Sequence, residues 1–398
     1  MVDYTHIING KAVTSLKKMS VINPANMQRI AEVPLANKDQ LDEAVAAART
    51  AFYSWSTKPQ EDRAAVLFKI ASVIEDNIKE YKQLLTSEQG KTLANAEFEL
   101  GACIAALRGT AELRLPDKVL FEDDELKILE RRVPIGVISF TGSTETGKKV
   151  MAGASAGLKR LTLELGGKDP AIVLPDVDPS KITPELFWAA FINNGQTCFA
   201  AKRIYVHEKI YDEFRDQFVK FAKTIKTGDG MDPSSQLGPV QNVLQYKRVV
   251  SFIEDSRANN HTFALGGVVS PDPTNGLFIP VSIVDNPPDH SKIVREEPFG
   301  PILPLLKWSE EAEVIRRAND TEYGLSASVW GKDTEAVERI ARQIQAGTVC
   351  MNEFNPIDRY SAFGGHKQSG LGVENGIHGL LSFTNIQSLT LKKKPGFL

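Results

Sequence analysis

The second half of the chain alternates short apolar runs with helical segments, and this alternation limits the folds available to it. From Ala171 onward, strand-like apolar runs recur at 171–174, 203–206, 326–330 and 347–350. The helical patterns among them occupy 209–226, 242–258 and 333–345. Strands that alternate with helices form a largely parallel sheet with helices on its faces. The sequence therefore predicts an α/β lobe.

The first half carries other patterns. Apolar residues at helical spacing predict two surface helices, one over 38–56 and one that begins after Pro59 and runs through Ile78. Two short apolar runs around an acidic turn predict a hairpin at 117–133. Near the carboxyl end, 381–391 alternates apolar and polar residues like a half-exposed strand. We expect that strand to pair with the hairpin or with another subunit.

Length and charge narrow the class of partner. The chain has 398 residues, enough for two or three lobes, and a formal net charge of −3. That charge gives nucleic acid and acidic lipid no general attraction, so we expect a small-molecule partner. The amino terminus has no secretion signal, and no segment approaches the ~18 apolar residues of a membrane span. These features predict a soluble, cytoplasmic protein.

The cysteine and histidine patterns argue against a metal centre. The three cysteines, Cys103, Cys198 and Cys350, are too scattered for a disulfide framework or a metal site, and the six histidines show no ligand spacing. We expect no metal and a reducing compartment. Cys103 lies in a helical pattern and Cys350 in a strand-like run, so both are interpreted as ordinary buried thiols.

Cys198 has different surroundings. It ends the small, polar segment 191–198, FINNGQTC, in which Gly195 permits a tight approach of the backbone. A free thiol has a pKa near ~8.5, so a nucleophilic cysteine needs help from backbone dipoles or a neighbouring group. An ordinary buried thiol is the alternative. The polar setting favours a covalent nucleophile.

A carboxylate that could serve such a thiol lies 34 residues upstream. Glu164 follows an apolar pair and precedes Gly166 and Gly167, where the backbone can project a side chain into a cleft. Half-buried, it would have a raised pKa and could act as a general base for water. Taken alone, Glu164 is better interpreted as a salt-bridged loop glutamate. Together with Cys198, it indicates acyl-thioenzyme chemistry.

Other segments suggest ligand contacts less strongly. The segment 140–149 follows an apolar run and opens a helical one, so its free amides could hold a pyrophosphate, although a turn without a ligand is common. The segment 295–301 is rigid, which holds Glu297 in place for a ribose hydroxyl, with a plain charged loop as the alternative. The segments 352–356 and 363–372 could line a substrate funnel or merely form turns.

In this order and spacing, these segments resemble the aldehyde dehydrogenase superfamily over about residues 9–393. The motifs that carry the resemblance are LELGGK at 163–168, NxGQxC at 193–198, FTGST at 140–144, EEPFGP at 296–301 and FGGxKxSG at 363–370. The resemblance implies that Cys198 attacks an aldehyde to form a thiohemiacetal and that hydride then passes to NAD or NADP. It also implies that Glu164 activates the water that hydrolyses the thioester to the acid.

The same resemblance implies cofactor contacts. It places Gly142, Ser143 and Gly147 at the cofactor phosphates, backbone near Leu165 at the nicotinamide amide, and Glu297 with Phe299 at the ribose and ring. Phe199 is bulkier than the family's usual residue after the cysteine, which narrows the aldehyde pocket.

The implied fold class is α/β, with a truncated Rossmann-like cofactor domain, an α/β catalytic domain and a small β oligomerisation element. The expected boundaries are 1–116 and 134–165 for the cofactor domain, 166–378 for the catalytic domain, and 117–133 with 379–398 for the oligomerisation element. The last of these implies a homo-oligomer, a dimer or tetramer.

One departure from the family pattern stands out. Val137 runs straight into Ile138 where family members carry their first βα units, so ~60–70 residues are absent at ~30 residues per unit. The family's Pro-Trp-Asn segment, whose asparagine stabilises the oxyanion, and its Lys-Pro-Ser segment, which holds the adenosine ribose, occur nowhere in the sequence. We expect 133–141 to form one continuous strand across the seam.

The departure leaves three alternatives. The first is an active aldehyde dehydrogenase with a shortened, impaired cofactor lobe. The second is a truncated isoform that has lost dehydrogenase activity but keeps oligomerisation or thiol esterase activity through Cys198 and Glu164. The third is a structural subunit that joins full-length relatives through 117–133 and 381–393. The sequence leaves open the identity of the aldehyde and the choice between NAD and NADP.

Overall fold

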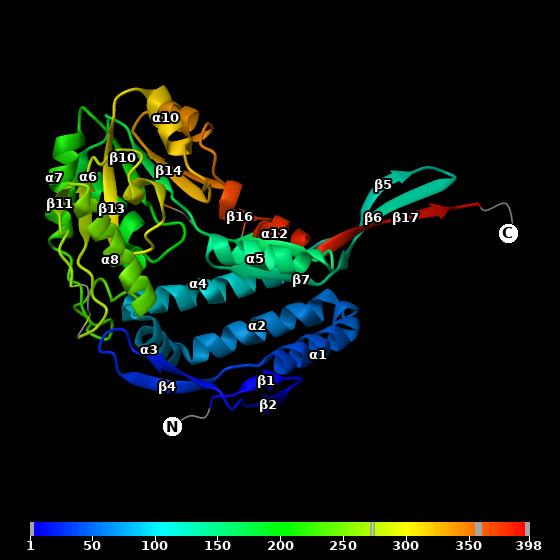
Figure 1. Cartoon of the computed structure of the whole chain (residues 1–398). Coiled ribbons are helices and arrows are strands. Elements are labelled where there is room, and N and C mark those ends of the chain that lie inside the picture. Colours follow the sequence, from blue (N-terminus) through cyan, green and yellow to red (C-terminus); the bar gives the residue numbers. More distant parts are fainter. Residues whose placement is uncertain (1–3, 271–272, 274, 355–359, 395–398) are drawn as a thin grey trace.

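A seven-stranded sheet forms the centre of the larger lobe (Figure 1). The computed structural model describes residues 4–270, 273, 275–354 and 360–394. In the order β11-β12-β13-β10-β9-β14-β15, all neighbours are parallel except β11 and β12. The strands are β9 Pro170–Val173, β10 Arg203–His207, β11 Thr262–Leu265, β12 Ser282–Asp285, β13 Ile302–Trp308, β14 Ser326–Trp330 and β15 Thr348–Met351. The predicted α/β lobe with a largely parallel sheet is confirmed.

Alternate residues of the central strands face two separate cores, because successive side chains of a strand point to opposite faces. Ile172 and Tyr205 lie in one buried cluster, which α8, α10 and α11 cover. Ala171 and Ile204 lie in the other, which α6 and α7 cover. The helices of this lobe are α6 Pro179–Phe191, α7 Tyr211–Ala222, α8 Val243–Ala258, α9 Lys292–Arg295, α10 Glu311–Asn319 and α11 Thr334–Ala341.

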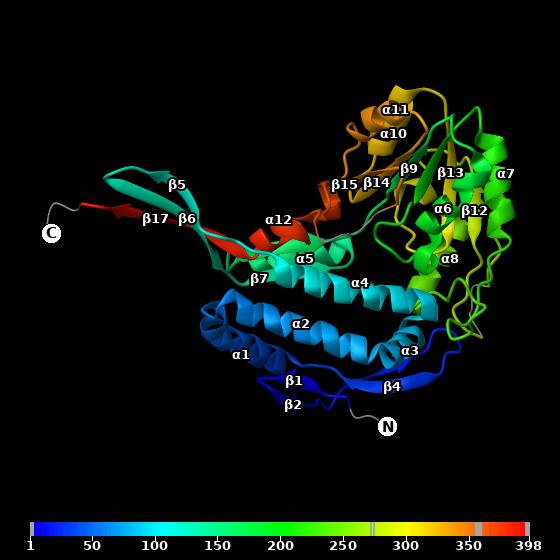
Figure 2. The same cartoon turned by 180° about the vertical axis from the view of Figure 1, so that it is seen from behind.

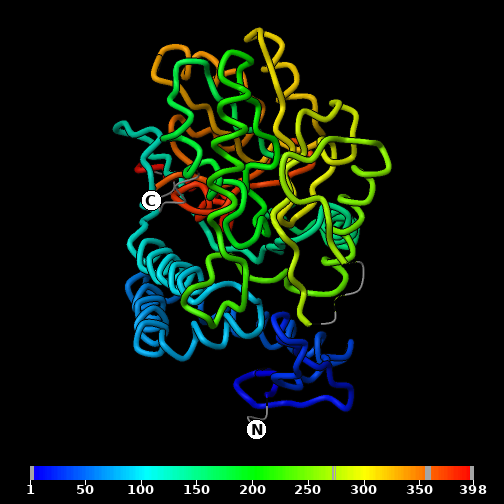
Figure 3. The backbone as a smooth tube through the Cα atoms, turned by 90° about the vertical axis from the view of Figure 1, so that its left-hand side faces the viewer, coloured from blue at the N-terminus to red at the C-terminus, as the bar shows by residue number. Residues whose placement is uncertain are grey.

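The amino-terminal part is mainly helical and forms a layer below the larger lobe (Figures 1 and 3). It contains α1 Lys38–Ser56, α2 Gln60–Asp76, α3 Ile78–Gln89 and α4 Leu93–Glu112, preceded by the hairpins β1 His6–Ile8 with β2 Lys11–Val13 and β3 Lys18–Ile22 with β4 Arg29–Pro34. The predicted helix at 38–56 is confirmed. The second expected helix ends earlier, at Asp76, because the chain turns at Asn77 and starts a new helix.

The cysteines outside the site differ from one another. Cys350 is buried on β15, as expected. Cys103 is exposed, so the expectation that it is buried is wrong. It lies on a face of α4 whose neighbours Gly101, Ala102 and Ala105 are also exposed.

A small sheet connects the helical layer to the larger lobe. Its order is β16-β8-β7, in which β7 Val137–Thr141 and β8 Arg160–Glu164 are parallel and β16 Gly370–Leu371 is antiparallel to β8. Helix α5 Thr144–Ser155 joins β7 to β8. Strand β7 is therefore an edge of this sheet.

A long antiparallel ribbon projects from the body of the molecule, as Figures 1 and 2 show from opposite sides. It consists of β5 Lys118–Glu122, β6 Leu126–Pro134 and β17 Thr384–Lys392, and β17 follows α12 Gly376–Ser382. The predicted hairpin is confirmed, and the carboxyl-terminal strand pairs with it. That strand begins three residues later than expected because α12 takes up the first positions.

The expected continuous strand over 133–141 is wrong. β6 ends at Pro134 and pairs with β17, whereas β7 begins at Val137 and pairs with β8. The chain leaves one sheet and enters another at residues 135–136, so a single strand cannot serve both partners. Among the residues that the structure describes, no helix is long and apolar enough to cross a membrane.

Candidate functional site

Cys198 follows a sharp turn at the end of α6. The short helix η1, Ile192–Gly195, includes three consecutive left-handed residues, Asn193, Asn194 and Gly195, with φ of 51°, 59° and 72°. A Cβ on Gly195 would lie 2.5 Å from the carbonyl oxygen of Gly300, so the turn requires glycine here. The predicted tight approach is confirmed. It packs the turn before Cys198 against the loop that carries Glu297.

The Cys198 thiol is poorly placed to ionise by itself. The residue is half-buried. Burial raises the pKa of the thiol to about 11; the carboxylates of Asp169 and Glu297 act in the same direction, and Lys202 opposes them. Because thiolate is the reactive form, the thiol needs a proton acceptor or added positive charge before it can attack.

Glu164 is the last residue of β8 and is only 4% exposed. Its backbone is fixed, because Gly142 donates an amide hydrogen bond to its carbonyl (3.0 Å) and the next amide bonds to Ser369 (2.8 Å). Neither carboxylate oxygen has a hydrogen-bond partner in the described part of the chain. Burial raises the pKa of the Glu164 carboxyl to about 8, and the nearby Glu374 carboxylate contributes in the same direction. Such a group can accept a proton near neutral pH.

The structure brings the two candidate catalytic segments together without joining their side chains. A Cβ on Gly167, three residues after Glu164, would lie 2.7 Å from the carbonyl oxygen of Cys198. No hydrogen bond between the Glu164 carboxylate and the thiol occurs among the residues described, and the charge that acts on Glu164 is that of Glu374. The joint role of Cys198 and Glu164 therefore stays a prediction.

The strand-to-helix turn at 140–149 is confirmed. Ser143 caps α5, since its hydroxyl accepts a hydrogen bond from the Thr146 amide (3.3 Å). A Cβ on Gly147 would lie 2.6 Å from the Leu165 side chain, so this glycine allows α5 to pack on Leu165. Gly142 lies against the ring of Phe140 in the same way. Contact of Gly142, Ser143 and Gly147 with phosphates stays a prediction.

Glu297 is held in place, as the rigid segment predicts. Its Oε1 lies 3.2 Å from the Lys202 ammonium and accepts a hydrogen bond from the Gly167 amide at 3.3 Å. Phe299 has a left-handed φ of 51°, and the side chain of Gln245 donates to its carbonyl at 2.9 Å. The loop is thus anchored to both α8 and the glycine segment.

The sequence reasoning missed the charged residues that surround these groups. Asp169 is fully buried; burial raises the pKa of its carboxyl to about 7, and Ser326 donates a hydrogen bond to it at 2.8 Å. Lys202 contacts the thiol loop, and Glu374 acts on Glu164. A signal existed for the first two, because Lys168-Asp169 and Lys202-Arg203 are charged pairs placed directly before apolar runs.

Three aromatic rings form a cluster that includes the residue after Cys198. The Phe199 ring lies 5.9 Å from that of Phe354 and 6.1 Å from that of Phe363, centroid to centroid. The segments 352–356 and 363–372 thus each bring an aromatic ring to Phe199, and their role in a substrate funnel stays a prediction. Residues 355 and 356 lie outside the described residues. A narrowed aldehyde pocket stays a prediction.

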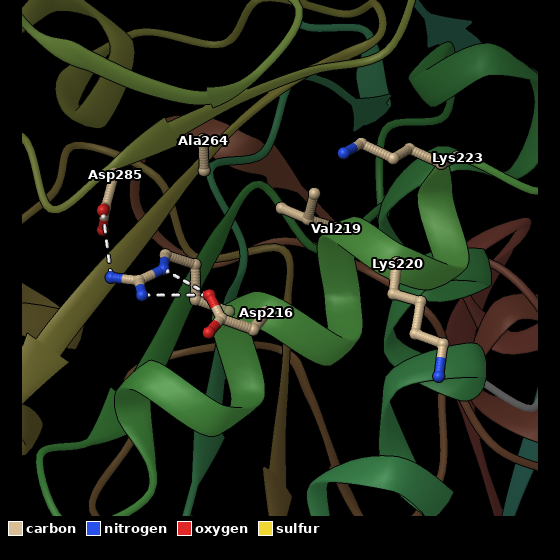
Figure 4. A pocket seen from close by; sticks show the side chains of 7 residues that line it. Asp216, Val219, Lys220, Lys223, Ala264 and Asp285 are labelled. Carbon is tan, nitrogen blue, oxygen red and sulfur yellow. Dashed lines mark hydrogen bonds and ion pairs between the residues drawn. The ribbon is translucent and has the colours of Figure 1, made fainter.

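A hollow of about 500 Å³ lies elsewhere, along α7 and the end of β12 (Figure 4). Arg215 bridges it by bonding to Asp285 (3.4 Å) and Asp216 (3.0 Å). The lining contains none of the predicted site residues. In the described part of the chain, no group of three or more His, Cys, Asp or Glu residues could hold a metal ion.

Comparison with known proteins gives a consistent result. The model of the aldehyde dehydrogenase family matches residues 12–139 and 123–389. A probable aldehyde dehydrogenase of Pseudomonas sp is 33% identical over 469 positions, which cover 97% of this chain and 94% of the relative. Betaine aldehyde dehydrogenase of Bacillus subtilis is 31% identical, with 98% of each chain covered.

Solved structures agree. The betaine aldehyde dehydrogenase of Staphylococcus aureus in complex with NAD+ superimposes with a TM-score of 0.94 at 26% identity, over 99% of this chain and 96% of that one. An aldehyde dehydrogenase of Bacillus cereus gives a TM-score of 0.94 at 28% identity, over 99% and 97%. The α/β fold class implied by the sequence motifs is thereby confirmed.

Proposed function

The chain belongs to the aldehyde dehydrogenase family, and we propose that it oxidises an aldehyde to a carboxylic acid through a thiohemiacetal and a thioester on Cys198. The observation that carries the proposal is the Glu164 carboxylate. It is buried and unpartnered among the described residues, has a pKa raised to about 8, and lies three residues from the backbone contact between Gly167 and Cys198. A structural glutamate would be expected to have a hydrogen-bonded partner.

The proposed roles follow the chemistry of each group. The Cys198 sulfur, once deprotonated, attacks the carbonyl carbon to form a thiohemiacetal. Loss of a hydride from that carbon, which a bound nicotinamide would accept, converts the adduct into a thioester on the sulfur. Glu164 then removes a proton from water as the water oxygen attacks the thioester carbon. The carbon–sulfur bond breaks, and the sulfur recovers a proton. Phe199, Phe354 and Phe363 line the approach of the aldehyde.

The residues present fit one end of a nicotinamide cofactor, the kind of ligand bound in the Staphylococcus aureus structure. The capped amino terminus of α5, with Gly142 and Ser143, would hold the phosphates. Leu165 packs against Gly147 of α5, and the loop of Glu297 and Phe299 packs on the turn before Cys198. These three residues would hold the nicotinamide end. When bound, NAD or NADP supplies the hydride acceptor. At the adenosine end, β7 is already the edge of the sheet.

We further propose that an internal segment of the cofactor lobe is missing. The alignment with the Pseudomonas relative spans 469 positions and covers 97% of the 398 residues of the chain, so at least 71 of its positions (469 − 398) have no counterpart in this chain. The two matched family segments overlap at 123–139, across the Val137–Ile138 seam. The exposed edge of β7 therefore favours a second candidate function, a thiol esterase with impaired dehydrogenase activity.

Two assays separate these functions. Formation of reduced cofactor, followed at 340 nm with a set of aldehydes and either NAD or NADP, tests the dehydrogenase. Hydrolysis of an activated ester, compared between the parent and Cys198→Ala, tests the esterase. Activity in neither assay from a folded chain would overturn both proposals and leave a structural subunit, joined through the β5, β6 and β17 ribbon. Light scattering would then give its oligomeric state.

A further inference from the structure

A buried ammonium group lies between the thiol loop and Glu297. Lys202 is only 4% exposed. Its Nζ donates to the carbonyl oxygens of Thr197 (2.9 Å) and Cys198 (2.5 Å) and lies 3.2 Å from Glu297 Oε1. The Ala200 carbonyl oxygen lies farther away, at 3.5 Å. An ammonium has three hydrogens to donate, so the three nearer acceptors are enough to satisfy it. Lys202 is therefore a fully paired cation at the thiol.

The ion pair between Lys202 and Glu297 also contacts the glycine segment that follows Glu164. Glu297 Oε1 accepts a hydrogen bond from the Gly167 amide at 3.3 Å. A Cβ on Gly166 would collide with the other carboxylate oxygen. Three stretches that are distant in the sequence, 166–167, 197–198 and 297, thus meet around one lysine and one glutamate.

The neighbouring Lys168 provides an internal contrast. It is fully buried, and within the described residues its Nζ has no hydrogen-bond partner. Burial lowers the pKa of Lys168 well below its usual value, and the charges of Arg203 and Lys202 act in the same direction. Among the described residues, Lys168 lacks the hydrogen-bond partners that Lys202 has, and it is absent from the charges that act on Cys198.

The balance of charge at the thiol depends on Lys202. The charged groups that act on Cys198 are the carboxylates of Asp169 and Glu297 and the ammonium of Lys202. Without the ammonium, a thiolate would form next to two carboxylates and no cation, inside a site where charges are poorly screened. Two backbone carbonyls of the thiol loop would also lose their donor.

We propose that Lys202 is a positioning residue for Cys198, which fixes the 197–198 backbone and neutralises Glu297 so that a thiolate can form. The inference rests on the proposed role of Cys198 as the nucleophile. Lys202 lies outside the NxGQxC motif, which ends at Cys198.

The test measures the rate at which iodoacetamide alkylates Cys198 as a function of pH, with no aldehyde or cofactor present. Peptide mass spectrometry separates Cys198 from Cys103 and Cys350. In Lys202→Met, we expect the midpoint of the profile to rise by about one pH unit, so that alkylation near pH 8 is about tenfold slower. Lys168→Met is the matched control, because it removes an equally buried lysine, and it should keep the parent profile.

A second variant should shift the alkylation midpoint in the opposite direction. Glu297→Gln removes a carboxylate but keeps the ammonium, so the alkylation midpoint should fall. The double variant Lys202→Met/Glu297→Gln should recover part of the shift that Lys202→Met causes. If Lys202→Met does not fold, Glu297→Gln decides the question alone.

The proposal is overturned if folded Lys202→Met alkylates with the parent midpoint, or if the midpoint of Glu297→Gln is unchanged or raised. Either result would leave Lys202 as packing only. Alkylation does not require turnover. A chain that shows both shifts but oxidises no aldehyde would support the role of Lys202 and count against the dehydrogenase.

Discussion

The larger lobe and the rest of the molecule bury their apolar side chains to different degrees. Every buried member of the two core clusters lies between Ala171 and Ala346, where helices cover both faces of seven strands. Outside this lobe, α1 has no buried residue, and the side chains of Tyr53, Phe98 and Leu158 are 73%, 70% and 94% exposed. The small sheet there ends at β7 after three strands.

This difference in packing places thiol chemistry and cofactor binding in regions of unequal stability. Asp169 directly precedes β9, and Cys198 and Lys202 lie in the loop that leads into β10, so the well-packed lobe gives the thiol a rigid support. The turn proposed to hold the cofactor phosphates belongs to the poorly packed part, on an edge strand. The small sheet has only three strands and leaves apolar side chains of α1 to α4 exposed. Because hydrophobic stabilisation scales with the apolar area removed from water, this part should be less stable than the larger lobe. Thiol chemistry should therefore be more robust than cofactor binding.

The largest expected effect breaks function and leaves both parts folded. Cys198→Ala should lower ester hydrolysis and aldehyde oxidation by roughly 10³-fold or more, because no other nucleophile is proposed. Steady-state assays measure the loss, and thermal unfolding should match the parent. Cys103→Ala, which removes an exposed thiol on α4, is the control and should keep full activity. Hydrolysis by Cys198→Ala at a tenth of the parent rate would refute the assignment.

Replacing a phenylalanine by alanine in each part compares how well the two parts are packed. Phe187→Ala removes a fully buried ring in α6 and should cost about 3–5 kcal/mol of unfolding free energy, by the lost transfer energy and the cavity left behind. Phe98→Ala removes a 70% exposed ring in α4 and should change stability by less than about 0.5 kcal/mol. Urea unfolding measures both. A cost above about 2 kcal/mol for Phe98→Ala would mean that this face is covered in solution.

Glu164 joins the two parts, since it ends β8 and precedes the glycine segment. Glu164→Gln should slow thioester hydrolysis by about 10²-fold, the lower range for loss of a general base. In the parent, hydrolysis should rise with pH through a midpoint of about 8. Glu374→Gln removes a carboxylate that raises this pKa, so its midpoint should be lower. A parent rate that is flat from pH 6 to about 9 would contradict the proposed base.

Sequence reasoning worked best where local pattern and tertiary packing agree. The buried strands around Ile172 and Ile204 are continuous apolar runs, so their pattern predicts the parallel sheet directly. The glycine at 195 was also informative, because a left-handed turn against Gly300 leaves no room for a side chain.

It failed where the deciding partner is distant in the chain. The helical spacing of apolar residues continues from α2 into α3, so this spacing does not reveal the turn at Asn77. The strand over 133–141 is divided because its two halves pair with β17 and β8, and the apolar pattern does not show which sheet each half joins. Lys202 was missed for the same reason, since its partner Glu297 lies far along the sequence.

The Glu164 carboxyl should also make the stability of the chain depend on pH. This carboxyl has a pKa of about 8 in the folded chain, above its usual value of 4.5. Between these two values the folded chain binds more protons than the unfolded chain, so this group's contribution to stability falls as pH rises and levels off above about 8. One carboxyl can contribute a slope of at most about 1.4 kcal/mol per pH unit.

Comparison with Glu164→Gln isolates that slope. Asp169, whose carboxyl pKa is raised to about 7, adds a slope of the same sign, but it is present in both chains and cancels in the difference. Urea unfolding at several pH values should therefore show the parent losing stability relative to Glu164→Gln from about pH 5 to 8. If the difference stays constant over that range, Glu164 is ionised in the folded chain, and a buried, proton-accepting carboxylate beside Cys198 is excluded.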